Sequence, residues 1–197
     1  MQFKAQARGG KGVKGMDIKE EDETLSVLHV MNHDDLLFFT NTGRVFKLPA
    51  YELPQGSRIA KGQAIVNLLQ LQPEEKVSAI LKAELEDKNH LFMVTRDGTV
   101  KRTEMNQFEN IRRSGLIAQK IPKGDELCWV LATSGKNEII IVSKKGKAIR
   151  FKEEDVRDMG RAAAGVRGIK LAPGDRVVEA AAVYDPNKSR LLVVMEN

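Results

Sequence analysis

The sequence predicts an all-β protein, built as a propeller-like array of about four four-stranded blades. Three observations lead to this fold class. Hairpin-like stretches recur along the chain, glycines recur in phase with them at intervals of about fifty residues, and no stretch shows a convincing helical pattern. One four-stranded unit cannot bury both of its faces, so units of this kind stack against their neighbours.

The hairpins give the clearest evidence for the repeat. The stretches 36–48, 91–103 and 139–151 each consist of a short apolar strand, a turn that ends in glycine and a second strand. The turn glycines are Gly43, Gly98 and Gly146. Glycine adopts the positive φ that tight hairpin turns require, and Asp97-Gly98 is a strong hairpin signal.

A second series of glycines is aligned in phase with the first: Gly15, Gly62, Gly115 and Gly168. Each precedes a short predicted strand, and in three of the four copies a proline-containing polar turn and a further strand follow. In the first copy an acidic run at 20–23 replaces that turn. The short strands are expected at 16–18, 63–66, 116–118 and 169–171, and the further strands within 122–131 and 173–180.

The repeats divide the chain into approximate units 1–35, 36–90, 91–138 and 139–190, with 191–197 opening another unit. The N-terminal residues match a point just after a hairpin, since Gln2-Phe3 resembles Gln107-Phe108. We therefore expect residues 1–197 to be a single repeat domain and a fragment of a longer chain.

Composition narrows the function. The 32 lysines and arginines exceed the 27 aspartates and glutamates, which gives a net charge of +5 and favours an acidic partner. The single cysteine, Cys128, cannot form an internal disulfide and is expected in the core. No apolar run approaches the ~20 residues needed to cross a bilayer, and the N-terminus has no signal-peptide pattern. We expect a cytoplasmic protein with no membrane partner.

Residues 6–12 are expected to form an anion-binding loop. Three of these seven residues are glycine, so the backbone can approach a ligand closely, and nearby cations supply charge that a phosphate would neutralise. The spacing differs from that of a nucleotide-binding P-loop. The loop carries five residues more than the corresponding stretch of the third repeat, so it should protrude. Its candidate DNA-binding residues are Gln6, Arg8, Gly9, Gly10, Lys11, Gly12 and Lys14.

The string from Gln6 to Gly12 resembles the box motif of the A chain of bacterial DNA gyrase, Gln-(Arg/Lys)-Arg-Gly-Gly-(Arg/Lys)-Gly, with six of seven positions matching. Ala7 departs from the pattern, which has a basic residue there. The strings 43–48 and 98–103 are also similar to the C-terminal domain of gyrase A, and the likeness extends over essentially the whole chain. This resemblance implies a β-pinwheel, in which neighbouring blades share strands.

Basic residues recur at one position of the hairpins, the fourth residue after each turn glycine: Lys47, Arg102 and Arg150. Further cations lie beside them and in the loops before the second glycine series. Stacked blades would arrange these side chains as a stripe around the rim, which could bind duplex phosphates without reading bases. The other rim candidates are Arg44, Arg58, Lys61, Lys101, Arg112, Arg113, Lys147, Arg161 and Arg167.

No catalytic constellation, nucleotide fingerprint or cofactor motif stands out. His29 and His33 do not form a persuasive metal site, and neither Tyr51 nor Tyr184 is placed like a cleavage nucleophile. Aromatic residues make up 5% of the chain and occupy strand-core contexts, which argues against single-strand binding. We expect no catalytic residue, no metal and no cofactor.

The resemblance implies a non-catalytic domain that wraps double-stranded DNA and thereby enables negative supercoiling by ATP-dependent gyrase. Its implied partners are duplex DNA, the rest of gyrase A, and gyrase B in an A2B2 complex, and the domain alone would be monomeric. Two alternatives remain open: the C-terminal domain of topoisomerase IV, whose box is degenerate, and a propeller used for protein–protein recognition, which would need an exposed apolar patch.

Overall fold

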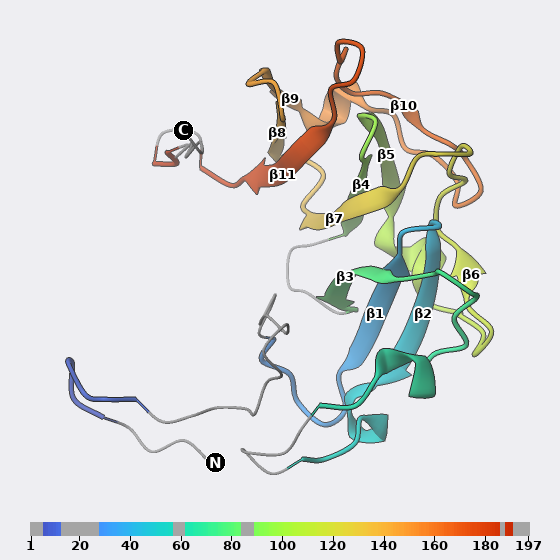
Figure 1. The fold of residues 1–197 in the computed structure, drawn as a ribbon, viewed down its shortest axis with the longest axis vertical. Coiled ribbons are helices and arrows are strands. Elements are labelled where there is room, and N and C mark those ends of the chain that lie inside the picture. The colour runs from blue at the N-terminus through green and yellow to red at the C-terminus, as the bar shows by residue number, and fades with distance from the viewer. Residues whose placement is uncertain (1–5, 13–27, 57–61, 84–88, 186–187, 191–197) are drawn as a thin grey trace.

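The computed structural model describes residues 6–12, 28–56, 62–83, 89–185 and 188–190. It contains three antiparallel sheets, and no α-helix occurs in these ranges, which confirms the all-β, propeller-like prediction (Figure 1). The first sheet has the order β3-β1-β2-β6, the second β10-β5-β4-β7 and the third β11-β8-β9. The strands are β1 (Asp35–Thr40), β2 (Arg44–Pro49), β3 (Val77–Lys82), β4 (His90–Thr95), β5 (Thr99–Glu104), β6 (Leu116–Ile117), β7 (Leu127–Thr133), β8 (Glu138–Ser143), β9 (Ala148–Lys152), β10 (Val166–Arg167) and β11 (Val177–Val183).

Neighbouring blades share strands. β6 follows β5 in the chain, yet it pairs with β2 of the preceding blade, where Leu116 lies opposite Val45. β10 follows β9 and pairs with β5, where Val166 lies opposite Val100. The segments that lead to these strands, 109–115 and 157–165, therefore pass from one blade to the one before it. We call them the first and second crossover segments.

Each blade has an inner and an outer edge. The inner strands β3, β7 and β11 contact one another in succession, β3 with β7 and β7 with β11. β6 and β10 lie on the opposite edge of their sheets, toward the right of Figure 1. The blades thus follow an arc, with the crossover segments on its outer side.

Packing between blades explains why β1 and β4 each have four consecutive apolar residues, 36–39 and 91–94. Leu37 and Phe39 of β1 pack with Leu91 and Met93 of β4 in one buried cluster. The other face of β4, with Phe92, packs against the third sheet in a second cluster. A strand that is buried on both faces loses the alternation of polar and apolar residues typical of a half-exposed strand.

The hairpin turns are built alike in all three sheets. A threonine or serine at the end of the first strand accepts a hydrogen bond from the backbone N–H four residues later, and the turn glycine between them has a φ of 80–84°. These bonds link Arg44 to Thr40, Thr99 to Thr95 and Lys147 to Ser143 at 3.1–3.2 Å. The predicted turns at Gly43, Gly98 and Gly146 are confirmed.

The alignment of the second glycine series is wrong at Gly168. The register of the shared strands makes Gly165 the counterpart of Gly115, because each directly precedes its strand and both have positive φ, 107° and 78°. The predicted strand at 169–171 is accordingly wrong, since the strand is Val166–Arg167. A two-residue strand has too little pattern of its own to fix its position.

Residues 63–66 do not form the expected strand. This region contains a 3-10 helix, η2 (Ile65–Asn67). It occupies the position in its repeat that β6 and β10 occupy in the following repeats. One further 3-10 turn follows the second strand of each of the three hairpins: η1 (Ala50–Glu52), η3 (Met105–Phe108) and η4 (Glu153–Asp155). The expected strand at 16–18 and Gly15 lie outside the described residues.

Cys128 is half-buried rather than a core residue. It lies where β7 bulges opposite Val94 and Thr95, so it is displaced from the regular alternation of the strand. Among the described residues no helix is long and apolar enough to cross a membrane.

Candidate nucleic-acid interface

The box loop, residues 6–12, is stabilised by hydrogen bonds within the loop. The backbone N–H of Gly10 donates to the carbonyl of Ala7, closing a turn in which Gly9 has a φ of 87°. The Gln6 side chain crosses the loop, and its Oε1 accepts the N–H of Gly12 at 3.1 Å. A Cβ on Gly10 would lie 2.6 Å from that same Oε1. Gln6 and the glycines therefore organise the backbone.

The two described cations of the loop, Arg8 and Lys11, are exposed. The loop thus presents a compact backbone with positive side chains directed to solvent, an arrangement suited to anions. Lys14 lies outside the described residues, as do the rim candidates Arg58 and Lys61.

The repeated cations at the fourth hairpin position are all paired with carboxylates. Lys47 lies 3.2 Å from Asp35, and Arg150 lies 3.2 Å from Glu138. Arg102 donates to both oxygens of Asp158, at 2.7 and 3.2 Å, and only 9% of the residue is exposed. These pairs join neighbouring strands at Lys47 and Arg150, and they join β5 to the second crossover segment at Arg102. DNA binding by this repeat position stays a prediction. Lys47 and Arg150 keep partial exposure, whereas Arg102 is committed to the fold.

Arg44 also has a structural role. It pairs with the buried Glu75 at 2.7 Å, donates to the carbonyl of Ser114 in the first crossover segment, and its guanidinium lies over the Phe46 ring at 4.7 Å. Burial would raise the pKa of Glu75, but hydrogen bonds from the Gln72 backbone and from two threonine hydroxyls, together with Arg44, lower it below its ordinary value. Arg44 is therefore held by contacts within the fold, and its binding to a phosphate stays a prediction.

Lys101 is fully buried, so the prediction that it lies on the rim surface is wrong. Its Nζ donates to the backbone carbonyls of Ala118 and Arg161 at 2.5 Å each. Burial lowers the pKa of Lys101 to about 8, and the nearby charge of Arg161 contributes to the same shift. The sequence carried a signal for this burial: the third residue after the turn glycine is Phe46 in the first hairpin and Ile149 in the third.

Several exposed cations lie on the outer side of the arc. Arg112 and Arg113 lie in the first crossover segment and Arg167 on β10, all exposed, while Arg161 in the second crossover segment is partly buried. Lys147 is exposed at the start of the outer strand region of the third sheet. Among the described residues, no carboxylate lies within ion-pair distance of the cations in this group other than Arg113. These unpaired cations are Arg112, Lys147, Arg161 and Arg167.

Sequence reasoning missed two exposed lysines on the same side. Lys120 and Lys170 occupy one repeat position, five residues before the aspartates Asp125 and Asp175 of the following turns. Counting backward from those turns, rather than forward from glycine, would have found them.

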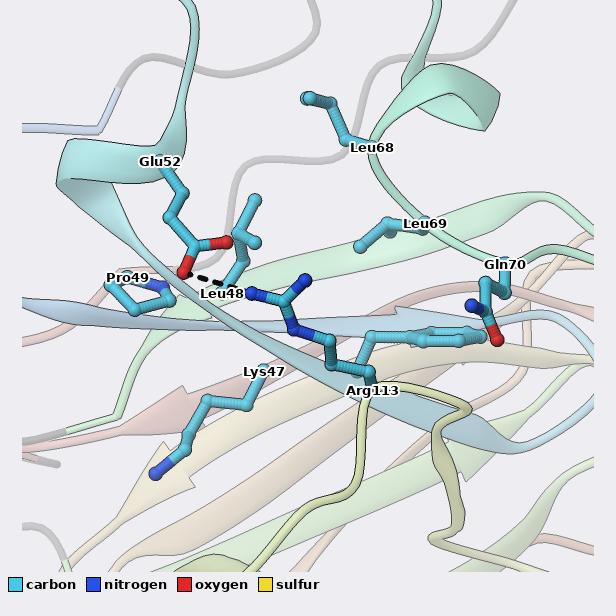
Figure 2. A pocket seen from close by; sticks show the side chains of 9 residues that line it. Lys47, Leu48, Pro49, Glu52, Leu68, Leu69, Gln70 and Arg113 are labelled. Atoms are coloured by element: carbon cyan, nitrogen blue, oxygen red, sulfur yellow. Dashed lines mark ion pairs between the residues drawn. The ribbon is translucent and has the colours of Figure 1, made fainter.

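Three hollows lie along the crossover segments. Arg113 spans the mouth of a small pocket of about 150 Å³ and pairs with Glu52 at 3.5 Å, as Figure 2 shows. A wider groove of about 510 Å³ is lined by Arg112 and Arg161, and another of about 550 Å³ by Arg167 and Lys170. The groove that contains Arg112 and Arg161 has no carboxylate in its lining.

Within the described ranges, His90, Glu104 and Asp158 are the residues close enough to hold a metal ion, with potential ligand atoms within 4.8 Å of one another. Both oxygens of Asp158 already accept hydrogen bonds from Arg102, and His90 Nε2 lies 3.3 Å from one of them. A metal would have to share Asp158 with a guanidinium, which its charge opposes. The ion pair between Arg102 and Asp158 in this cluster fastens the second crossover segment to the second blade.

The fold and the cationic outer edge together define a class: a strand-sharing, propeller-like repeat domain with an outer surface suited to a polyanion. Comparisons with known proteins agree. The family model "DNA gyrase C-terminal domain, beta-propeller" matches residues 2–31, 34–84, 89–134 and 137–183. The chain belongs to the DNA gyrase C-terminal domain family.

Similar proteins include the DNA gyrase A chain of Klebsiella oxytoca, 45% identical over 196 residues, and that of Escherichia coli, 46% identical over 178 residues. These alignments cover 99% and 90% of this chain, which spans about a fifth of the relatives' length, 22% and 20%.

Two solved structures are similar at 31% identity each. A DNA topoisomerase IV C-terminal domain gives a TM-score of 0.78, with 87% of this chain and 54% of that one covered. A DNA gyrase A C-terminal domain gives 0.66, with 92% and 59% covered.

Proposed function

We propose that this chain binds duplex DNA along the outer side of its arc and wraps it, without sequence specificity, as the C-terminal part of a gyrase A protein. The observation that carries the proposal is the group of unpaired cations Arg112, Arg161, Arg167 and Lys147, contributed by successive blades at the outer edge. Cations spread along a curved surface contact phosphates wherever the duplex passes, and such contacts carry no base information.

Wrapping by several blades follows from the stiffness of DNA. Bending 20–30 bp by 40–90° costs on the order of 1–6 kcal/mol, so no single blade could hold the bend alone. The box loop contributes a separate contact, with Arg8 and Lys11 exposed on a backbone fixed by Gln6. We propose that it holds one end of the wrapped segment and so gives the wrap its positive handedness.

In the whole protein, the domain would present wrapped DNA to the cleavage machinery in the rest of gyrase A, with gyrase B supplying ATP-driven strand passage in an A2B2 complex. The isolated domain would be a monomer in the bacterial cytoplasm, associated with the nucleoid, and would neither hydrolyse ATP nor cut DNA. The ion pair between Arg102 and Asp158 would join the second crossover segment to the second blade, and those of Arg44 and Arg150 would stabilise the first and third blades, without any part in strand cleavage.

The test combines affinity and handedness. Titration with a long duplex should give tight binding that weakens steeply with salt, and ligation of a nicked circle on the protein should shift the linking number in the positive direction. Changing Arg8 and Lys11 to alanine should lower affinity moderately and remove most of the linking-number shift, while unfolding free energy stays within about ±0.5 kcal/mol. A variant that retains the full shift would contradict the role of the box.

A domain like that of topoisomerase IV is the second candidate, favoured by the TM-score of 0.78. Both candidates bind duplex DNA, so affinity does not separate them. A linking-number shift that is absent in the parent chain, and unchanged in the Arg8 and Lys11 variant, would favour this candidate over gyrase.

A further inference from the structure

The groove lined by Arg112 and Arg161 differs from its neighbours in charge. Its polar lining consists of Asn110, Arg112, Ser114 and Arg161, with no acidic group, and its volume is about 510 Å³. The pocket beside it contains Glu52, which pairs with Arg113, and the third hollow contains Asp97 beside its cations. Of these three hollows along the described crossover segments, this groove is the one whose lining has cations and no carboxylate.

The two arginines come from different crossover segments, so their relative placement depends on what joins those segments. Hydrogen bonds join the second crossover segment to the residues directly after β6, the strand to which the first crossover segment leads. Lys101 Nζ donates to the carbonyl of Ala118, just after β6, and to the carbonyl of Arg161 itself. Gln119 Nε2 donates to the carbonyl of Ala164 at 2.7 Å, and the Lys120 N–H donates to that of Ala163 at 3.2 Å.

We infer that Arg112 and Arg161 form one seat for a single backbone phosphate of duplex DNA, and that the buried Lys101 is the positioning residue that holds this seat together. The inference rests on the proposed function and specifies part of its site. Guanidinium groups bind phosphate oxygens bidentately, and two of them that line one groove can contact the same phosphate.

The number of phosphates that the two arginines contact can be measured from the salt dependence of DNA affinity. Neutralising one phosphate contributes about 0.9 to the slope of log affinity against log salt. If both arginines hold the same phosphate, the double variant Arg112→Ala/Arg161→Ala should lose about 0.9 of slope and bind a 40-bp duplex about tenfold more weakly at 0.1 M salt. A loss near 1.8 would mean two separate phosphates, and no loss would mean that the groove does not contact DNA. Either result overturns the seat.

The matched control removes two exposed lysines next to the inner strands, Lys76 before β3 and Lys136 after β7. The net charge falls by the same amount, but the groove is untouched. The slope should change by less than about 0.3 in this control if the effect of the arginine pair is local. An equal loss of slope would attribute the effect to total charge and overturn the seat.

A double-mutant cycle tests the role of Lys101. Lys101→Met should weaken duplex binding about tenfold in the parent protein and by less than twofold in the Arg112→Ala/Arg161→Ala background, because the seat it positions is already gone. A purely structural effect would persist in both backgrounds and would overturn the positioning role. Should Lys101→Met fail to fold, Gln119→Leu removes the neighbouring bond to Ala164 and serves in the same cycle.

The outcomes also separate this inference from the proposed function. Tight, salt-dependent binding by the parent with unchanged slopes in the arginine variants would leave DNA binding intact and reject only the seat. Failure of the parent chain to bind duplex DNA would reject both.

Discussion

The first and second blades bury side chains of opposite character, one apolar and one charged, at the same position of the repeat. Phe46 and Lys101 occupy one position of the repeat, the third residue after the turn glycine, and both are buried. Phe46 packs with Leu69 in an apolar cluster. Lys101 is accompanied by Gln119, which occupies the repeat position of Leu69, six residues before the acidic residue of the next turn.

The difference teaches that the surroundings, and not the backbone position, decide what can be buried there. The aromatic ring is stabilised by apolar contact, whereas the ammonium group is stabilised by two backbone carbonyls, one directly after β6 and one in the second crossover segment. Polar burial costs more than apolar burial, but its hydrogen bonds fix the two segments relative to each other.

The largest expected effect on stability comes from removing the buried aromatic ring of the first blade. Phe46→Ala should cost about 3–5 kcal/mol of unfolding free energy, measured by urea denaturation, because the ring is buried and its neighbours cannot fill the space. Ile149→Ala is the matched control, since it removes an apolar side chain from the same repeat position in the third sheet, where 36% of the residue is exposed. A loss below about 1 kcal/mol is expected for it.

The burial of Lys101 in the second blade should be visible in the pH dependence of stability. The folded pKa of Lys101 is about 8 and the ordinary value is 10.5, so between these pH values the unfolded chain binds more protons than the folded one. Stability should therefore rise with pH across this window, by up to about 3 kcal/mol, relative to Lys101→Met. Parallel pH profiles for the two proteins in urea denaturation would refute a depressed pKa at this position.

Glu75, in the turn that precedes β3, allows a second comparison between the first and second blades. Its carboxylate accepts hydrogen bonds from Thr40, Thr42 and the Gln72 N–H and pairs with Arg44. Because its folded pKa is lowered, its stabilisation is present above the ordinary pKa of 4.5 and is lost as pH falls through the folded value.

Glu75→Gln should thus cost about 2 kcal/mol at pH 7 and reduce the acid sensitivity of the melting temperature. Asp125→Asn, at the corresponding turn of the next repeat, is the control. Asp125 accepts backbone N–H groups of Asp97 and Glu126, so a smaller loss of about 1 kcal/mol is expected.

The smallest effect concerns backbone conformation in the same turns. Glu74 has a φ of 64°, while its counterparts Gly124 and Gly174 have φ values of 90° and 69°. Glu74→Gly should stabilise the protein by about 0.5–1 kcal/mol by relieving this strain. The reverse change, Gly124→Ala, should destabilise by about 1 kcal/mol even though nothing lies within 4 Å of the added Cβ. A loss of stability in Glu74→Gly would contradict the backbone explanation.

The hairpins could be predicted from the sequence because their information is local. Gly43, Gly98 and Gly146 each lie between two apolar runs, and turn and strands are specified within about 13 residues. The shared strands could not be placed this way. β6 has two residues, and its pairing with Val45 depends on a partner in another repeat.

The candidate site was predicted in part for the same reason. Arg112, Arg161 and Arg167 lie in or beside loops, where charge and exposure go together. Arg102 and Lys101 lie on a strand that is covered on both sides, and the residues covering them, Asp158 and Arg161, belong to the next repeat. A cation count within one repeat cannot show such a partner.

Strand sharing also governs how the domain is made on the ribosome. The outer edge of β2 at Val45 can pair only after Leu116 has been synthesised, about 70 residues further on. At 5–20 residues per second this edge stays unpaired for about 4–14 s. The same delay recurs for Val100 until Val166 emerges. An unpaired edge is a template for aggregation, but here each open edge is covered as soon as the short strand of the next repeat has been made, so the exposed edge moves forward along the nascent chain.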